Sequence, residues 1–136
     1  MSGAAIVRAM LAAHAPVLAL VPAERIVLGQ LPQGAAVPAI SVSTVSQNEE
    51  ATVARNMPVK MQRERVQVTV LVGTNSADLA RIVKAAALGA GVHRTTIVGL
   101  RVRSVIPYGV GPEIPPGDDR IYEQSRDFMV TFIEAN

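Results

Sequence analysis

Apolar residues near the start of the chain follow the spacing of a helix. Four of them fall between Ile6 and Leu11 at positions that share one helical face, which predicts a first helix that Ser2 can cap. Pro16 disfavours helical geometry in the residue before it, so we expect this helix to break there and a short turn to follow.

The same spacing returns after Asn75, which is a favourable N-cap residue. Asp78 is well placed in the first turn of the helix that would follow. We therefore predict a second helix that ends at Gly89 or Gly91. Its expected buried stripe consists of Leu79, Ile82, Val83 and Ala86, and its expected wet face carries Arg81 and Lys84.

Alternation at period two predicts the strands. It is clearest from Val66 to Val72, where every second residue is valine. The alternation extends back toward Lys60, so we expect this strand to begin early and to project from the body. The pattern shifts phase at Val45, which predicts a β-bulge. Four further strands are predicted at residues 25–28, 39–47, 99–108 and 121–134.

These elements predict an α+β fold in one domain, residues 1–136. The expected order is α-β-β-β-α-β-β, with a single mostly antiparallel sheet of about five strands. Two helices packed on one face of that sheet give the economical arrangement. Residues 48–58 lose all periodicity and are predicted to form an exposed loop or the tip of a long hairpin.

Composition adds two limits. The chain has 136 residues, enough to bury a sizeable core, and no cysteine, so disulfides and thiolate metal sites are excluded. Residues 9–23 are apolar, but His14, Pro16 and Pro22 interrupt them, and a membrane span needs about 20 uninterrupted apolar residues. We expect a cytosolic chain with no membrane segment.

Charge is divided unevenly along the chain. Residues 55–103 carry nine basic and two acidic side chains, whereas residues 104–136 carry six acidic and two basic ones. Because the net charge is only +2, this division is more informative than the total.

The residues give little support for catalysis or cofactor binding. His14 and His93 lack ligand partners at metal spacing, and the glycines from Gly29 to Gly34 are not followed by the lysine of a phosphate loop. The adjacent acids Asp118 and Asp119 do not provide the six or so oxygens that calcium prefers. We expect no catalytic residue, no cofactor and no metal.

Two pairs of arginines are the strongest candidates for an interaction site. Arg63 and Arg65 share one strand face, and alternation places Arg101 and Arg103 together on another, opposite Val102. On neighbouring strands they would form a basic stripe. That stripe has three interpretations: a solvated sheet face, a nucleic-acid footprint, or a contact between subunits with the acidic third of another copy. The acidic candidates for that contact, or for the lumen of a ring, are Asp118, Asp119, Glu123 and Asp127.

The layout along most of the chain resembles that of the tail-completion, or tail-terminator, proteins of long-tailed bacteriophages. The resemblance lies in the segments LPQGAAVPAISV, VQVTVLVGTNSADLARIV and SRDFMVTFIE. It implies a cofactor-free structural protein that forms a ring, typically a hexamer, on the head-proximal end of the tail tube. The ring would stop tube polymerisation and offer the surface that joins the DNA-filled head, after assembly in the host cytoplasm.

The resemblance also implies partners: further copies of the chain, the tail tube protein and the head–tail connector, with DNA passing through the lumen. Candidate partner contacts in the unpatterned segments are Glu49, Glu50, Arg55 and Glu113. Three alternatives stay open at this point: a head–tail connector, a small ligand-binding regulatory domain, and a DNA-binding module suited to the basic middle.

Overall fold

The computed structural model describes residues 3–31, 36–50, 59–73, 76–89, 92–97, 100–112, 114 and 121–135. This part of the chain contains the helices α1 (Gly3–Ala12), α2 (Ala15–Leu18) and α3 (Ser76–Gly89) and a short 3-10 helix, η1 (Ala23–Arg25). Its strands are β1 (Ile26–Leu28), β2 (Ala39–Glu50), β3 (Val59–Val72), β4 (Val92–Ile97), β5 (Leu100–Val110) and β6 (Tyr122–Ala135).

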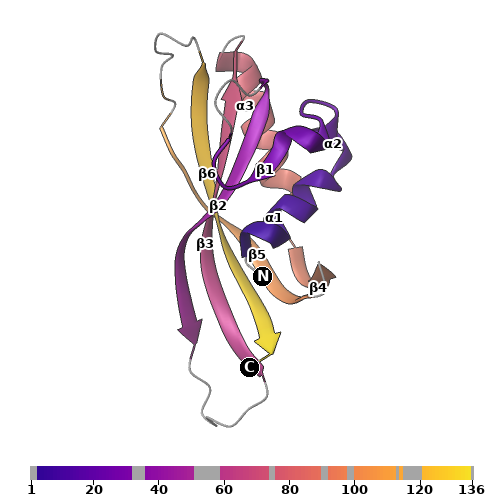
Figure 1. Cartoon of the computed structure of the whole chain (residues 1–136), viewed down its shortest axis with the longest axis vertical. Helices are drawn as coiled ribbons and strands as arrows, with labels where there is room; N and C mark the ends of the chain where they lie inside the picture. Colours follow the sequence, from indigo (N-terminus) through magenta and orange to yellow (C-terminus); the bar gives the residue numbers. More distant parts are fainter. Residues whose placement is uncertain are drawn as a thin grey trace.

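The strands form one sheet in the order β1-β2-β3-β6-β5-β4 (Figure 1). Only β1 and β2 run parallel among these neighbours, and all the other pairs are antiparallel. The predicted α+β class is confirmed. The sheet has six strands rather than about five, because β4 was not predicted. Its sequence, VHRTTI, lacks apolar alternation, and an edge strand that pairs only with β5 does not require it.

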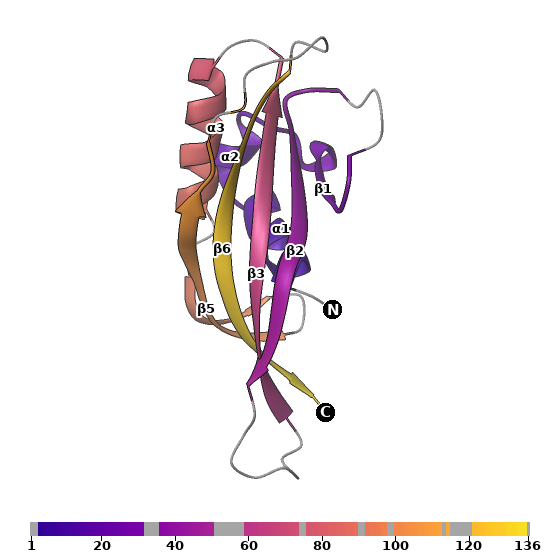
Figure 2. The same cartoon turned by 90° about the vertical axis from the view of Figure 1, so that its left-hand side faces the viewer.

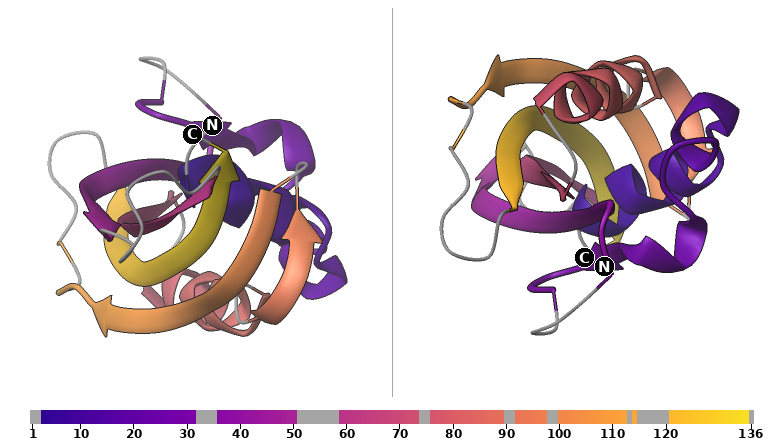
Figure 3. Two further views of the ribbon diagram at one scale, coloured as in Figure 1. Left: turned by 90° about the horizontal axis from the view of Figure 1, so that it is seen from below. Right: turned by 90° about the horizontal axis from the view of Figure 1, so that it is seen from above.

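The helices cover one face of this sheet (Figure 2), as predicted. We call it the helix face and the opposite one the outer face. Viewed along its long axis, the sheet is strongly twisted and curved (Figure 3). The helix face carries the valines of β3 from Val66 to Val72 and Phe128, Val130 and Phe132 of β6, all of them buried.

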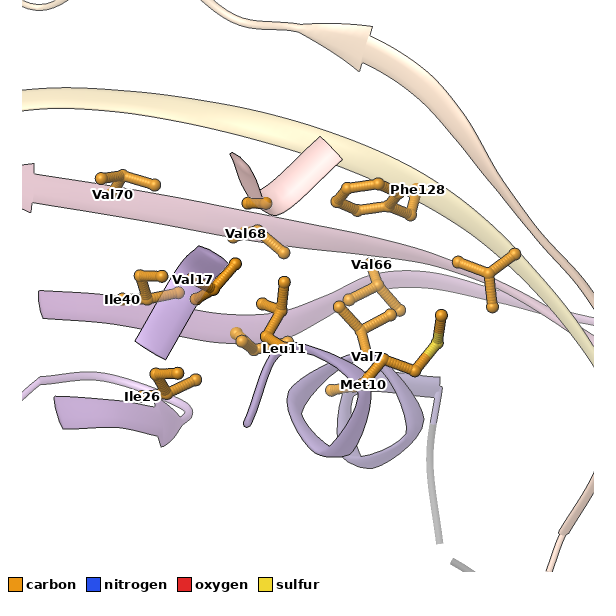
Figure 4. Close-up of a cluster of buried hydrophobic side chains, with 14 of the residues drawn as sticks. Val7, Met10, Leu11, Val17, Ile26, Ile40, Val66, Val68, Val70 and Phe128 are labelled. Atoms are coloured by element: carbon orange, nitrogen blue, oxygen red, sulfur yellow. The ribbon is translucent and has the colours of Figure 1, made fainter. Parts of the chain in front are cut away.

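The core lies between this face and the two longer helices. Val7, Met10 and Leu11 of α1 point toward Val66 and Val68 of β3 (Figure 4). The predicted stripe of α3 is buried and its predicted wet residues are exposed. The first helix ends at Ala12, and Pro16 lies in the first turn of the separate helix α2, which begins at Ala15. In the first turn of a helix the missing N–H of proline costs nothing. The predicted caps, Ser2 and Asn75, lie outside the described residues.

One glycine is needed for its backbone conformation. Gly29, directly after β1, has φ +78°, a value that residues with a Cβ rarely adopt. Its N–H donates to the Val42 carbonyl at 2.8 Å, and the Ser41 hydroxyl donates to the Gly29 carbonyl. This turn ties the end of β1 to β2.

Two β-bulges in β2 and β5 bear on the predicted faces. The register between β2 and β3 shifts between Thr44 and Ser46, so the predicted bulge at Val45 is confirmed. A second shift, between Val102 and Ser104, makes Arg103 an extra residue in β5. Simple alternation from Arg101 to Arg103 therefore does not hold. Simple alternation would place Val105 on the same side as Arg101 and Arg103, but Val105 is buried together with Val102.

The predicted early start of the third strand is also confirmed, because β3 begins at Val59 and pairs with β2 as far as Glu50. The lower halves of β2, β3 and β6 extend past the helices as a projecting arm (Figure 1). The prediction of a loop or hairpin tip over residues 48–58 is wrong at its start, because residues 48–50 continue the strand β2 and pair with β3. The rest of that segment, residues 51–58, lies outside the described residues.

Candidate assembly interface

Arg65 occupies the centre of the outer face, where it bonds within its own chain. Its Nε donates to Asp127 Oδ2 at 2.7 Å, and its Nη2 lies 2.5 Å from the same oxygen. Its guanidinium carbon is also 4.9 Å from the centroid of the Tyr108 ring, a cation–π distance. Three strands, β3, β5 and β6, therefore contribute to one contact. The charges of Arg65 and Asp127 compensate each other inside the subunit.

This contact yields a measurable coupling. We expect a double-mutant cycle with Arg65→Ala and Asp127→Ala to give a coupling energy of about 1 kcal/mol in urea unfolding, because Asp127 is largely buried. The matched control is Asp78 and Arg81 on α3, whose charged atoms lie 3.5 Å apart in an exposed setting. That pair should couple by roughly 0.3 kcal/mol. Equal coupling energies in the two cycles would contradict the interpretation of Arg65–Asp127 as the stronger, partly buried ion pair.

The other predicted arginines flank β6 rather than lying on neighbouring strands. Arg63 is opposite Thr131 across one edge of β6, and Arg101 is opposite Ile133 across its other edge. Arg63, Arg101 and Arg103 are all exposed. The expected stripe on adjacent strands is therefore wrong, since β6 separates β3 from β5 in the sheet.

The acidic candidates are dispersed. Glu123 is half-buried on β6 and forms an isolated β-bridge with Ile114. Asp127 is the partner of Arg65. Glu49 and Glu50 form the last residues of β2, opposite Gln62 and Met61 of β3. The remaining candidates, Arg55, Glu113, Asp118 and Asp119, lie outside the described residues.

The structure adds a buried carboxylate that sequence reasoning passed over. Glu64 is 2% exposed, and its Oε2 accepts the Gly3 N–H at 2.7 Å, so it caps the start of α1 from the sheet. Its Oε1 accepts from the Gln47 amide at 3.1 Å. The signal was present, because Glu64 has the same parity as the buried valines of β3. A Cβ on Gly3 would lie only 3.1 Å from Val66 Cγ2, so the helix end packs closely on the strand.

Exposed apolar side chains form the other surface that the sequence did not reveal. Ile106, Tyr108 and Val110 at the end of β5, together with Ile114 behind it, are each about half exposed. Tyr108 lies beside the Arg65–Asp127 pair, because its ring contacts Arg65. Clustered exposed hydrophobic residues mark interaction surfaces. A large aromatic residue with charged neighbours is typical of protein–protein contacts.

A cavity of about 450 Å³ opens near the far end of the sheet, between α2, α3 and the Val37–Pro38 segment. Its lining includes the apolar residues Leu20, Val72 and Ile82 and the charged residues Asp78 and Arg81. The two charged side chains lie within an ion-pair distance of each other.

The described residues contain no group of three or more histidine, cysteine or acidic side chains placed to hold a metal ion. None of the helices described is long and apolar enough to cross a membrane.

Comparison with known proteins identifies the family. The profile of the family described as Tail completion protein gp17 matches residues 5–104. Among solved structures, a chain from the virion of a native gene transfer agent particle has the same fold, with a TM-score of 0.71 at 13% identity. That match covers 98% of this chain and 96% of the other. No curated protein sequence matches the chain.

The family match spans the elements from α1 through the first half of β5. The structural likeness continues through β6, because it covers nearly the whole chain. The chain therefore belongs to the Tail completion protein gp17 family of structural tail proteins.

Proposed function

We propose that this protein forms a closed ring that caps the tail tube, ends tube polymerisation and offers the surface on which the head is joined. The ring lies at the head-proximal end of the tail and assembles in the host cytoplasm. Its partners are further copies of the chain, the tube protein on one side and the head–tail connector on the other.

The observation that carries the proposal is the placement of the strand ends at two opposite ends of the sheet. β2 ends at Glu50 and β3 begins at Val59, at the end of the arm (Figure 1). β5 ends at Val110 and β6 begins at Tyr122, toward the opposite end of the sheet (Figure 1). Since β3 has 14 residues and a strand rises about 3.3 Å per residue, these ends lie about 45 Å apart.

A ring that caps the tail tube needs two different faces, one for the tube and one for the head. Subunits whose strands run through the thickness of a ring would present the strand ends at Glu50 and Val59 on one face and those at Val110 and Tyr122 on the other. The compensated charge of Arg65 and Asp127 also suits a lumen through which DNA passes without specific binding, because paired charges attract phosphate weakly.

The test is tail length in particles assembled without this protein. We expect tails of uncontrolled length, because nothing ends tube growth, and we expect complementation with the wild-type chain to restore one length. Electron microscopy of purified tails measures the distribution. Tails of normal length that lack heads would instead indicate a head–tail connector and would overturn the capping function.

Native mass measurement of the isolated protein supplies the matching physical test. The proposal predicts one closed oligomer. It also predicts that this oligomer attaches to the ends of purified tubes and not to their sides.

A further inference from the structure

Three exposed arginines surround Thr131 and Ile133 of β6. Arg63 of β3 is opposite Thr131 across one edge of β6, and Arg101 of β5 is opposite Ile133 across the other edge. Arg103 is the extra residue of the first β5 bulge. Because neighbouring strands lie about 4.8 Å apart, the backbones of β3 and β5 are only about 10 Å from each other across β6. We call Arg63, Arg101 and Arg103 the arginine cluster.

The arginine cluster lies on the outer face of the sheet. Residues paired directly across two strands share a face, so Arg63 lies with Thr131 and Arg101 with Ile133. Val130 and Phe132, which alternate with these two residues of β6, are buried on the helix face. A bulge sets two residues against one, and here Arg103 and Ser104 lie opposite Thr131. The helices pack on the other side of the sheet (Figure 2) and leave the cluster uncovered.

The positive charge of the cluster is not compensated in the part of the chain that the structure describes. Neither the Arg101 nor the Arg103 side chain has an ion pair or a hydrogen bond there. Asp127 lies four residues before Thr131 on β6, and its carboxylate is bonded to Arg65. Like charges on neighbouring strands destabilise a sheet. An anionic partner on this face would remove that cost.

The residues of the cluster fit phosphate groups. The planar guanidinium of arginine donates two parallel hydrogen bonds to phosphate oxygens. Thr131 and Ser104 are paired between the arginines, and hydroxyl groups are common donors to the phosphates of nucleic acids. A contact with another protein would instead be expected to have an apolar core.

The same residues favour a duplex over a single strand. Binding to single-stranded nucleic acid uses aromatic side chains on which the bases stack. The residues paired with the cluster on β6, Thr131 and Ile133, are not aromatic. Contacts with phosphates alone are independent of base sequence and let a protein slide along DNA.

We propose that the arginine cluster binds the phosphate backbone of duplex DNA without sequence specificity. This inference rests on the proposed ring, and it makes the outer face of each subunit the wall of the lumen through which DNA passes. The compensated pair Arg65–Asp127 confines the contact to the part of that face nearer the arm. DNA is thus held at a few phosphates and can still move through the ring.

Fluorescence anisotropy with a short duplex of random sequence tests the contact. Wild-type protein should bind at low salt, and the logarithm of its affinity should fall linearly with the logarithm of the salt concentration. The double variant Arg101→Ala with Arg103→Ala should bind roughly 10-fold more weakly or worse, and its salt slope should be smaller by about 2. The matched control, Arg81→Ala with Lys84→Ala, removes two positive charges from exposed positions of α3 and should retain the affinity and slope of wild type.

The outcomes separate the DNA contact from the ring itself. A ring in native mass that does not bind the duplex at low salt would overturn the contact and leave the ring standing. Equal losses in the two double variants would also overturn the contact, because only net charge would then matter. Equally tight binding of polyglutamate at the same salt would indicate an acidic protein partner and overturn it. A chain that binds duplex but stays monomeric, in solution and on tube ends, would overturn the ring and the lumen with it.

The position in the lumen has its own test, because the chain has no cysteine of its own. Arg103→Cys, labelled with a photoactivated cross-linker, should attach to DNA in assembled particles that contain DNA. Lys84→Cys on α3, labelled in the same way, is the control and should not attach. Cross-linking to DNA that is no greater from position 103 than from position 84 would overturn the assignment of the outer face to the lumen.

Discussion

Val70→Asp should abolish the folded state. Val70 is fully buried near the C-terminal end of β3, paired with Ile40 on one side and Gln124 on the other. The new carboxyl group would be held in the hydrophobic core without a partner, which costs at least about 4 kcal/mol. That cost is comparable to the whole stability of a small protein, about 5–15 kcal/mol. Circular dichroism and thermal melting measure the loss.

The matched control is the neighbouring residue on the same strand. Thr69 lies on the outer face, half-buried between Ser41 and Ser125. Thr69→Asp introduces the same group one position away and should retain cooperative melting within a few degrees of wild type. If Val70→Asp melted as cooperatively as Thr69→Asp, the assignment of the helix face would be wrong.

Glu64→Ala should produce the second largest loss, roughly 2–4 kcal/mol. The substitution removes the acceptor of the Gly3 N–H and of the Gln47 amide. An orphaned buried donor costs about 1–3 kcal/mol, and the missing methylenes leave a cavity beside Val66. The free energy of unfolding in urea measures the change.

Glu64→Gln separates the hydrogen bonds from the volume. Its amide oxygen can still accept from Gly3, so the loss should be less than half of that for alanine. The comparison with Gln also tests whether the charge of Glu64 contributes, because the helix dipole favours a carboxylate at the first turn of a helix. Equal losses for the two variants would mean that Glu64 acts through packing and not as an acceptor.

Local pattern predicted the elements that bury a face. The alternation from Val66 to Val72 and the stripe from Leu79 to Ala86 each reached the core as expected. Their faces are set by burial against many neighbours, and the residues that make those contacts lie at regular spacing. The bulge at Val45 was predictable for the same reason, since it breaks an otherwise regular pattern.

The edges of the sheet were not predicted because an edge strand pairs with one neighbour, which places fewer constraints on its sequence. β4 is bonded to one neighbour, so its sequence carries no alternation to detect. In β5, the bulge at Arg103 shifts the pattern by one residue and reverses which of Ser104 and Val105 faces the core. The contact of exposed Tyr108 with Arg65 and the Arg65–Asp127 pair both depend on the order of strands, which local spacing does not encode.

The insertion of β6 between β3 and β5 has a consequence for biosynthesis. Every earlier strand is made before Tyr122 leaves the ribosome, yet the two halves of the sheet are joined only through β6. Until that segment emerges, β3 keeps one side of its backbone unpaired, and such edges invite wrong pairing with other chains. The nascent polypeptide therefore carries an unpaired strand edge from the time that β3 emerges until β6 emerges.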